Sequence, residues 1–325
     1  MQLTLTLDIP PLPRPIRYTD NILLTGSCFT EHISDHLQQH KFNTLSNPNG
    51  ILFNPLSVAQ TLNSYLDEKQ YHTEDLFQLN ELWNSWDHHT RFSHISEQAA
   101  LHGINASQQE ASAFIKKADW VIITLGSAFQ YYLKESGKPV ANNHRAPAQW
   151  FEKRLLSIDV IVSALSKTLQ KLFTANPFTQ VLLTISPVRH IRDGVIDNNR
   201  SKARLLEAVH TLCEQSDKVF YFPAYELIID ILRDYRFFDI DFVHPNYLAT
   251  TFVWEHFSSA CIAPQARGLM QQVQDIVTAR SHRTRFPDTE AHKKFKDIYA
   301  AKTKALADKY PYLDLSEEIK YFSTI

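Results

Sequence analysis

A serine lies at a predicted strand-to-helix junction near the start of the 325-residue chain. The segment Gly26-Ser27-Cys28-Phe29 follows the apolar run Ile22 to Leu24 and precedes an amphipathic stretch. In a parallel α/β sheet such junctions lie at the carboxyl ends of the strands, where the ligand crevice forms. Ser27 is therefore a candidate nucleophile, provided that a base can reach it.

A candidate base and its partner lie far along the chain, in Asp241-Phe242-Val243-His244-Pro245. A serine hydroxyl becomes a good nucleophile only when a neighbouring base takes its proton, and that base must be held in one tautomer. The three-residue spacing lets the side chains of Asp241 and His244 project from one side of a turn. Pro245 suits the first position of a helix predicted over Tyr247 to Phe257. Ser27, Asp241 and His244 thus supply the three residue types of a serine hydrolase.

Two other kinds of chemistry fit the residue types less well. Cys28 could act as a thiol nucleophile with His244, but a side chain one position along the turn points elsewhere. A metal site could be built from histidines of one loop, although adjacent histidines rarely direct both rings at one ion. These histidines are His88, His89 and His94, with His190 further along the chain. We therefore predict no metal site and no cofactor.

Composition narrows the partners and the compartment. The formal charge of -2 gives no electrostatic reason to expect nucleic acid or an anionic membrane. Cys28, Cys213 and Cys261 are widely spread and suggest neither a disulfide framework nor a zinc site, which fits a reducing compartment. The sequence contains no run of 18 apolar residues, so we predict no membrane-spanning helix. Because Met1 to Leu7 resembles a short strand more than a signal peptide, we expect a cytoplasmic protein.

Apolar runs of strand length alternate with longer segments of helical period, which is typical of a parallel sheet covered on both faces. The predicted strands cover about Asn21 to Thr25, Trp120 to Thr124, Val181 to Ile185 and Val219 to Phe222. The predicted helices cover about Phe29 to His40, Pro55 to Leu66, Ala106 to Lys117, Glu152 to Phe173 and Asn199 to Cys213. The fold class predicted from this alternation is α/β.

Two parts of the chain depart from the alternation. The segment Asp75 to His94 is aromatic and polar, so we expect a hairpin or loop insertion there. From about residue 280 the chain becomes lysine-rich, with a helix predicted over Glu290 to Lys309. We expect one α/β domain over 1–279 and a helical extension over 280–325. The apolar face of that helix could dock on the domain or on a second copy, which leaves a homodimer open; it carries Phe295, Ile298 and Leu306.

Four segments taken together resemble the GSCFA family. They are Gly26-Ser27-Cys28-Phe29, Asn47-Pro48-Asn49-Gly50 with Asn54-Pro55-Leu56-Ser57, Ser186-Pro187-Val188-Arg189-His190, and Asp241-Phe242-Val243-His244-Pro245. Thr30 stands where the family motif has alanine. The family resembles the SGNH (GDSL-like) hydrolases, a class of esterases and acyl-transfer enzymes. The resemblance implies a three-layer α/β/α sandwich with a mostly parallel sheet.

The resemblance also assigns roles to residues. Ser27 matches the nucleophile, Asp241 with His244 match the last block, and Gly50 matches an amide that binds the oxyanion. The third block departs from the pattern, because Gly126-Ser127-Ala128 stands where SGNH enzymes have Gly-x-Asn. The asparagine of that block donates to the oxyanion, and losing one such donor typically costs ~10²–10³ in turnover.

Several residues could replace the missing donor. The Ser127 hydroxyl is one, and Asn142 or His144 is another. The backbone amides of Ser27 and Gly50 could also suffice, helped by the dipole of the helix that follows Ser27. The sequence does not choose among these.

The substrate implied by the resemblance is a small-molecule, glycan or lipid ester, cleaved through an acyl-enzyme on Ser27. Gly126, Asn142 and His144 are candidate substrate contacts. So are Arg189 and His190, which follow a predicted strand and could meet an anionic or polar group, although a salt-bridged arginine and a capping histidine fit equally well. Two alternatives stay open: an O-acyltransferase with the same triad, and a binding or scaffold protein that has lost catalysis.

Overall fold

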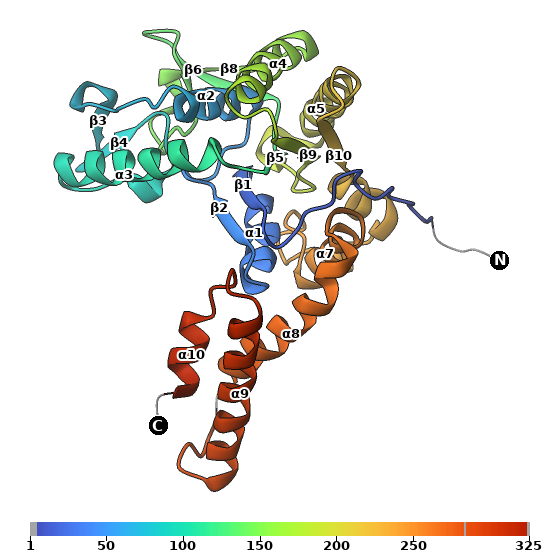
Figure 1. Ribbon diagram of the computed structural model, residues 1–325. Coiled ribbons are helices and arrows are strands. Elements are labelled where there is room, and N and C mark those ends of the chain that lie inside the picture. Colours follow the sequence, from blue (N-terminus) through green and yellow to red (C-terminus); the bar gives the residue numbers. More distant parts are fainter. Residues whose placement is uncertain (1–4, 283, 324–325) are drawn as a thin grey trace.

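The computed structural model describes residues 5–282 and 284–323. At its centre lies a five-stranded parallel sheet in the order β10-β9-β5-β1-β2 (Figure 1). The strands are β1 (Asn21–Gly26), β2 (Asn43–Ser46), β5 (Trp120–Leu125), β9 (Gln180–Ile185) and β10 (Val219–Phe222). From β1 the chain first adds β2 on one side and later β5 on the other. The order therefore reverses beside β1, and ligands of open α/β sheets bind at such a switch point.

Helices cover both faces of this sheet (Figure 1). One face carries α1 (Phe29–Gln39) and α7 (Tyr247–Cys261), and α8 (Pro264–Ser281) continues the same core by packing against α1. The other face carries α2 (Pro55–Leu66), α3 (Glu97–Ile115), α4 (Ile158–Ala175) and α5 (Val195–Glu214). Because strand side chains alternate, Leu23 packs in one core and Leu24 in the other. The predicted three-layer α/β/α sandwich is confirmed. A short helix, α6 (Ala224–Glu226), follows β10.

The four predicted strands are confirmed to within one residue at either end. The sequence did not reveal β2, which pairs with β1 at the edge of the sheet. Its residues, Asn43-Thr44-Leu45-Ser46, are mostly polar and only partly buried or exposed. The apolar run by which we recognise a buried parallel strand is therefore absent from this edge strand.

The helix predicted over Glu152 to Phe173 is wrong at its start. Phe151–Leu155 forms β8, which joins β6 (Phe129–Leu133) and β7 (Pro139–Val140) in an antiparallel sheet. The helix begins only after Ser157, whose hydroxyl accepts from the Val160 amide. Side-chain caps set such boundaries. In β8 one buried residue is followed by three exposed ones, so the strand lacks the strict apolar–polar alternation that marks a half-buried strand.

Other boundaries moved as well. Helix α3 begins at Glu97 instead of Ala106, because Ser96 caps it by accepting from the Ala99 amide at 3.3 Å. Helices α5 and α7 extend a few residues beyond their predicted ends. The strand predicted over Met1 to Leu7 falls partly on residues 1–4, which lie outside the described residues, and residues 5–7 form no strand.

The aromatic insertion forms a β-hairpin of β3 (Leu76–Leu79) and β4 (Leu82–Ser85). Phe77 of β3 stacks on Trp86, with ring centroids 3.6 Å apart. Trp86 is thus a packing residue of the hairpin.

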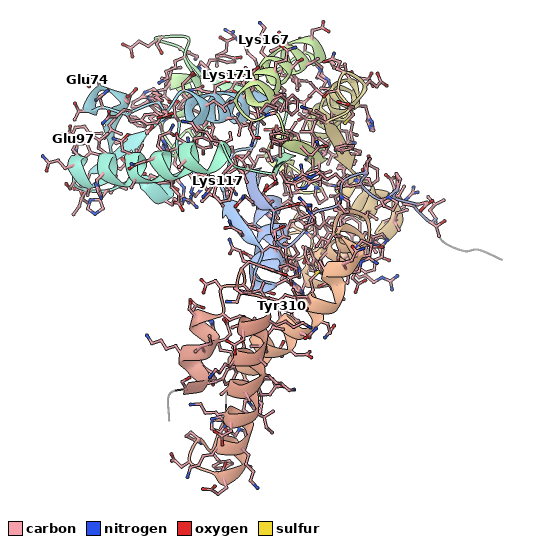
Figure 2. All side chains as sticks on the ribbon, viewed as in Figure 1. Glu74, Glu97, Lys117, Lys167, Lys171 and Tyr310 are labelled. Carbon is pink, nitrogen blue, oxygen red and sulfur yellow. The ribbon has the colours of Figure 1, made fainter. Side chains whose placement is uncertain are left out.

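The carboxyl-terminal residues form an arm that extends from α8 (Figure 1). It contains α9 (Glu290–Lys309), as predicted, and α10 (Ser316–Ser323), and Tyr310 lies where the arm meets the body of the molecule (Figure 2). Among the described residues, no helix combines the length and apolar character needed to cross a membrane.

Glu318 of α10 joins the arm to the body. Its side chain is 1% exposed and pairs with Arg280 of α8 at 2.7 Å and with Lys41, just after α1, at 2.9 Å. We expect Glu318→Gln to lower the free energy of unfolding by about 1.5–3 kcal/mol, because it removes charge-assisted hydrogen bonds from a buried carboxylate. Denaturant titration of Glu318→Gln and the parent measures this. Glu317→Gln, whose side chain is 69% exposed, is the matched control and should leave the free energy of unfolding essentially unchanged, because solvent screens its ion pair with Arg280.

Candidate functional site

Ser27 lies directly after β1 and two residues before α1. Its amide donates to the Thr124 carbonyl of β5 at 3.0 Å, which keeps it at the carboxyl edge of the sheet. The preceding Gly26 has φ of 140°, and a Cβ there would lie 2.1 Å from the Thr124 carbonyl oxygen. Only glycine fits so close an approach of two strands. The sheet therefore holds the Ser27 backbone in one place.

The Ser27 hydroxyl is buried and makes no hydrogen bond. The residue is 1% exposed, and its Oγ has no partner among the described residues. Leaving a buried hydroxyl unpaired costs about 1–3 kcal/mol, so most proteins avoid it. The Ser27 hydroxyl is therefore not tied to another group of the described chain, as a nucleophile requires, although the hydroxyls of Thr25 and Thr30 share this property.

Asp241 and His244 form the pair that their spacing predicts. His244 Nδ1 lies 2.6 Å from Asp241 Oδ2, and Asp241 Oδ1 accepts from the amides of Val243 and His244 at 2.9 and 3.0 Å. The His244 amide, its imidazole and the Val243 amide hold the pKa of Asp241 low, at about 2. Asp241 is thus ionised across the working pH range and orients the imidazole, which leaves His244 Nε2 directed away from the carboxylate.

No hydrogen bond joins Ser27 to His244 in the described structure. Two histidines nonetheless link the two regions. The charge of His244 acts to lower the pKa of both His32 on α1 and His190 after β9, although burial is the main cause of each shift. The side chain of His244 is 50% exposed and has room to turn. The structure therefore places Asp241 and His244 at the same end of the sheet as Ser27, but without a hydrogen bond between His244 and Ser27.

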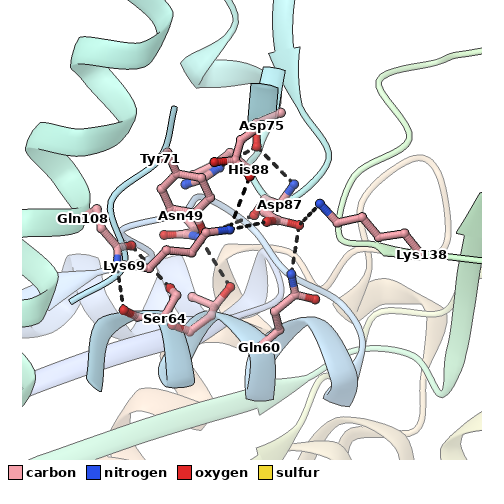
Figure 3. A network of polar contacts seen from close by, with 12 residues as sticks. Asn49, Gln60, Ser64, Lys69, Tyr71, Asp75, Asp87, His88, Gln108 and Lys138 are labelled. Carbon is pink, nitrogen blue, oxygen red and sulfur yellow. Dashed lines mark hydrogen bonds and ion pairs between the residues drawn. The ribbon is translucent and has the colours of Figure 1, made fainter. Parts of the chain in front are cut away.

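Gly50 belongs to a loop that a polar network fixes in place (Figure 3). Asn49 accepts from the Tyr65 hydroxyl of α2 at 2.8 Å and donates to the Asp87 carbonyl at 3.4 Å. The Asp87 carboxylate accepts from Gln60 at 3.0 Å and lies within 4 Å of two lysines, Lys69 and Lys138. Gly50 itself has φ of 81°, and a Cβ there would lie 2.1 Å from the His89 Cβ. The aromatic insertion thus supports this loop.

The amides predicted to bind the oxyanion are occupied. The Gly50 amide donates to the Asn47 carbonyl at 2.7 Å, and the Ser27 amide donates to Thr124. Neither amide is a free donor in the described structure. If either binds an oxyanion, its present hydrogen bond must first be exchanged, so these assignments remain predictions.

Gly126-Ser127-Ala128 is clamped from two sides. The amides of Gly126 and Ser127 both donate to the Phe53 carbonyl at 2.8 Å, and the Ala128 amide donates to Ser201 Oγ at 2.7 Å. The Ser127 hydroxyl accepts from the Phe129 amide at 3.1 Å. A Cβ on Gly126 would lie 3.3 Å from the Ser27 Cβ, so the two blocks are in contact. Gly126 therefore lies beside the candidate nucleophile, while the Ser127 hydroxyl is used by a hydrogen bond within its own turn.

Asn142 and His144 are engaged elsewhere. Asn142 Oδ1 accepts from the His144 amide at 2.8 Å, and His144 Nε2 lies 2.7 Å from the Ser85 carbonyl. The His144 ring packs edge-on to Phe77 and Trp86 of the insertion. None of these contacts involves Ser27, so the structure does not bring either residue to the nucleophile.

Arg189 and His190 follow β9 at the same sheet edge. His190 packs edge-on to Phe53, whose carbonyl holds Gly126, and burial lowers the pKa of His190 to about 4. Arg189 is half-buried, and its guanidinium forms no ion pair or hydrogen bond with the described residues. The salt bridge considered for this arginine from the sequence is absent from the described part of the chain.

Lys202 is a site residue that sequence reasoning missed. It lies on α5, is 1% exposed, and donates through Nζ to the carbonyls of Gly126 and Ser186, both at 2.6 Å. Burial lowers the pKa of Lys202 to about 7, and the charge of Arg189 acts in the same direction. No carboxylate pairs with it among the described residues. This buried ammonium lies beside the turn that contacts Ser27, so it adds positive charge to the site. The sequence does not predict this, because a single lysine in a helical stretch is usually exposed.

Asn47 was also missed. It is fully buried, its Oδ1 accepts from the Gly26 amide at 2.9 Å, and its Nδ2 has no partner within the described chain. It has φ of 45°, a conformation that asparagine tolerates better than most residues. A buried amide donor with nothing to bind thus lies against the residue before Ser27.

Comparison with solved structures finds only distant likenesses. A carbohydrate esterase family 3 protein from Talaromyces cellulolyticus is 10% identical, with 79% of this chain and 99% of that chain covered and a TM-score of 0.37. A Clostridium thermocellum family 3 carbohydrate esterase is also 10% identical, with 78% and 98% covered and a TM-score of 0.37. The periplasmic domain of a lipopolysaccharide acetyltransferase from Salmonella ser. Paratyphi A is 10% identical, with 76% and 85% covered and a TM-score of 0.33. No curated protein matches the sequence.

Sequence profiles give a clear result. The profile of the GSCFA family matches residues 21–257, which include the strand-end serine, the Asn47 to Gly50 loop and the Asp241–His244 pair. The profile described as the GSCFA domain protein, C-terminal domain, matches residues 273–324, which cover the second half of α8 and the arm. Since the first match alone spans well over half of the chain, the protein belongs to the GSCFA family.

Proposed function

We propose that this protein is an SGNH-like serine hydrolase that cleaves an O-acyl ester of a carbohydrate or lipid through an acyl-enzyme on Ser27. The observation that carries the proposal is the pairing of Asp241 with His244 at the sheet edge where Ser27 presents an unpaired hydroxyl. These three residues are of the types that serine catalysis requires: a nucleophile, a base that takes its proton, and a carboxylate that orients the base.

The reaction follows from these positions. The Ser27 oxygen attacks the acyl carbon while His244 Nε2 takes the hydroxyl proton, and Asp241 stabilises the imidazolium. His244 then returns the proton to the departing alcohol, which leaves the acyl group on Ser27. A water molecule, deprotonated by His244, releases the acid and restores the serine. Before the first step the exposed His244 ring must turn to reach Ser27, which no hydrogen bond of Ser27 opposes.

The oxyanion needs donors other than the missing asparagine of the third block. We assign this role to the free Nδ2 of Asn47, supported by the positive charge of Lys202 behind Gly126. A fixed donor and a fixed charge in a buried site stabilise the developing charge without reorganising first.

Replacement Asn47→Asp tests the donor. It keeps the acceptor that holds the Gly26 amide and removes the Nδ2 donor. We expect kcat to fall by about 10²–10³ with little change in KM, because only the transition state carries the oxyanion. Steady-state kinetics on an aryl acetate measures this, and an unchanged kcat would remove Asn47 from the oxyanion site. Asn63→Asp, on the side of α2 that faces α4, is the control.

Labelling with a fluorophosphonate tests the proposal as a whole. The probe should attach to Ser27, as identified by mass spectrometry of the peptide, and the parent should release acetate from phenyl acetate. His244→Ala should lose both properties. If the folded parent neither reacts with the probe nor cleaves any ester of an acetylated sugar or lipid panel, the protein is a binding protein of the same fold.

Acyl transfer is a second candidate function, because one observation favours it. Ser27 is 1% exposed, and a site that excludes water protects an acyl-enzyme from hydrolysis. Product analysis with and without added acceptor alcohols separates the two reactions. Accumulation of an acylated alcohol at the expense of free acid would indicate a transferase.

A further inference from the structure

A cavity of about 440 Å³ lies next to the Asp241–His244 pair. It is bounded by the loop after β9, the start of α5, the π-helical turn after β10 and the loop that carries Asp241. The lining includes Arg189, Val195, Ile228, Arg233, Phe238 and Phe242. Cavities of this size hold small-molecule ligands, and this one opens at the carboxyl edge of the sheet, where ligands of α/β proteins bind.

The cavity carries unpaired positive charge. Neither Arg189 nor Arg233 forms a side-chain ion pair or hydrogen bond with the described residues. Both carboxylates of the lining are already engaged: Asp234 accepts from the Arg236 amide at 2.9 Å and lies 3.5 Å from its guanidinium, and Asp241 holds His244. The carboxylates of the lining are therefore not paired with either arginine.

A third cation reinforces this charge. Lys202 lies behind the same strand end, and its interaction with Arg189 is repulsive. No carboxylate of the described chain pairs with either group. Like charges held together in a partly buried place cost free energy, which a bound anion would recover. The arrangement suits an anionic ligand that reaches Arg189 from the cavity.

The rest of the wall is apolar and unusually exposed. Val195 is 57% exposed, Ile191 53% and Phe242 60%, and all three line the cavity. Phe242 also has φ of 58°, a conformation rare for an aromatic residue. Exposed apolar groups gathered beside a site mark a binding surface, and backbone strain concentrates at such places.

We propose that this cavity binds the non-reacting part of an ester substrate that combines an apolar body with a carboxylate or phosphate, and that Arg189 binds the anion. The inference rests on the proposed ester chemistry for its position beside His244. It adds the class of substrate: the protein acts on acidic esters in preference to neutral ones.

Three aryl acetates test the proposal: phenyl acetate, 4-acetoxybenzoate and 4-acetoxyphenyl phosphate. We expect Arg189→Met to raise KM for at least one of the two anionic esters by about tenfold or more and to leave KM for phenyl acetate unchanged, because only the anionic esters lose a charge-assisted hydrogen bond. The anion with the larger loss is the one that the site prefers. Arg200→Met is the matched control, since Arg200 is exposed on α5 and pairs with Asp197. An equal change of KM for all three esters in Arg189→Met would overturn the proposal.

A binding measurement separates this inference from the proposed function. Ser27→Ala protein is titrated calorimetrically with 4-hydroxybenzoate, phenyl phosphate and phenol. Binding of at least one anion that is at least tenfold tighter than binding of phenol, and that is lost in Ser27→Ala/Arg189→Met, supports the site even if no ester is cleaved. Anions that bind no better than phenol overturn it, even if Ser27 proves to be a nucleophile.

Discussion

Replacing Ser27 with alanine is expected to abolish ester turnover and to make the protein more stable. Activity should fall by about 10⁴-fold or more, because the covalent intermediate can no longer form. The free energy of unfolding should rise by roughly 1 kcal/mol, because the substitution removes a buried hydroxyl that has no hydrogen-bond partner. Opposite changes in activity and stability are characteristic of a residue retained for function.

Two controls make this result specific to Ser27. Ser64→Ala removes a buried hydroxyl that donates to the Thr61 carbonyl at 2.8 Å, so it should lower stability by about 1 kcal/mol and keep activity. Cys28→Ala tests the rival nucleophile and should also keep activity, since burial raises the pKa of the Cys28 thiol and keeps it protonated. A Ser27→Ala protein that still forms an acyl-enzyme would refute the assignment of Ser27.

Replacing Lys202 with methionine is expected to change both the rate and its pH dependence. The variant loses the positive charge behind Gly126, and we expect kcat to fall by about 10-fold to 10²-fold. In the parent, the pKa of Lys202 is lowered to about 7, so activity should decline above that pH as the ammonium loses its proton. In Lys202→Met this decline at high pH should be absent. A pH profile of kcat from 5 to 10 measures both effects.

The pH dependence of stability measures the lowered pKa of Lys202 independently of the kinetics. The pKa of Lys202 in the folded protein lies below the unfolded value of 10.5, so between about pH 7 and 10.5 the unfolded state binds the extra proton. The free energy of unfolding contributed by this group therefore rises with pH across that window, and Lys202→Met should lose this rise. Lys171→Met is the control, since Lys171 of α4 is partly exposed and pairs with Asp67 after α2 (Figure 2). If kcat changes with pH above 7 in the same way in the parent and in Lys202→Met, the Lys202 charge has no role in catalysis. If the free energy of unfolding does so, the charge has no role in the pH dependence of stability.

Local pattern was enough to predict most of the main sheet and its helices. The apolar runs at Val181 and Val219 could hardly form anything but buried strands, and the Asp241–His244 spacing predicted a pair that the structure contains. The pattern failed where burial is partial. Strand β2 is polar because it lies at an edge, and β8 exposes three charged residues in succession.

The electrostatic parts of the site could not be predicted from the sequence, for a physical reason. Lys202 and Asn47 matter because of which atoms surround them after folding: two strand-end carbonyls for the ammonium, and no acceptor for the Asn47 Nδ2. Neither fact depends on a short motif. Conversely, Gly50, which fits the motif, and Ser127, which could replace the missing asparagine, already use their hydrogen-bonding groups locally.

The covered position of Ser27 has a kinetic consequence. With 1% of the residue exposed, an electrophile reaches the hydroxyl only after neighbouring side chains move aside. Modification then proceeds through an opening step that is common to all reagents. As a reagent is made more reactive, or more concentrated, its labelling rate should approach the same ceiling, namely the rate at which the site opens. That plateau would report the motion of the protein, separately from its chemistry.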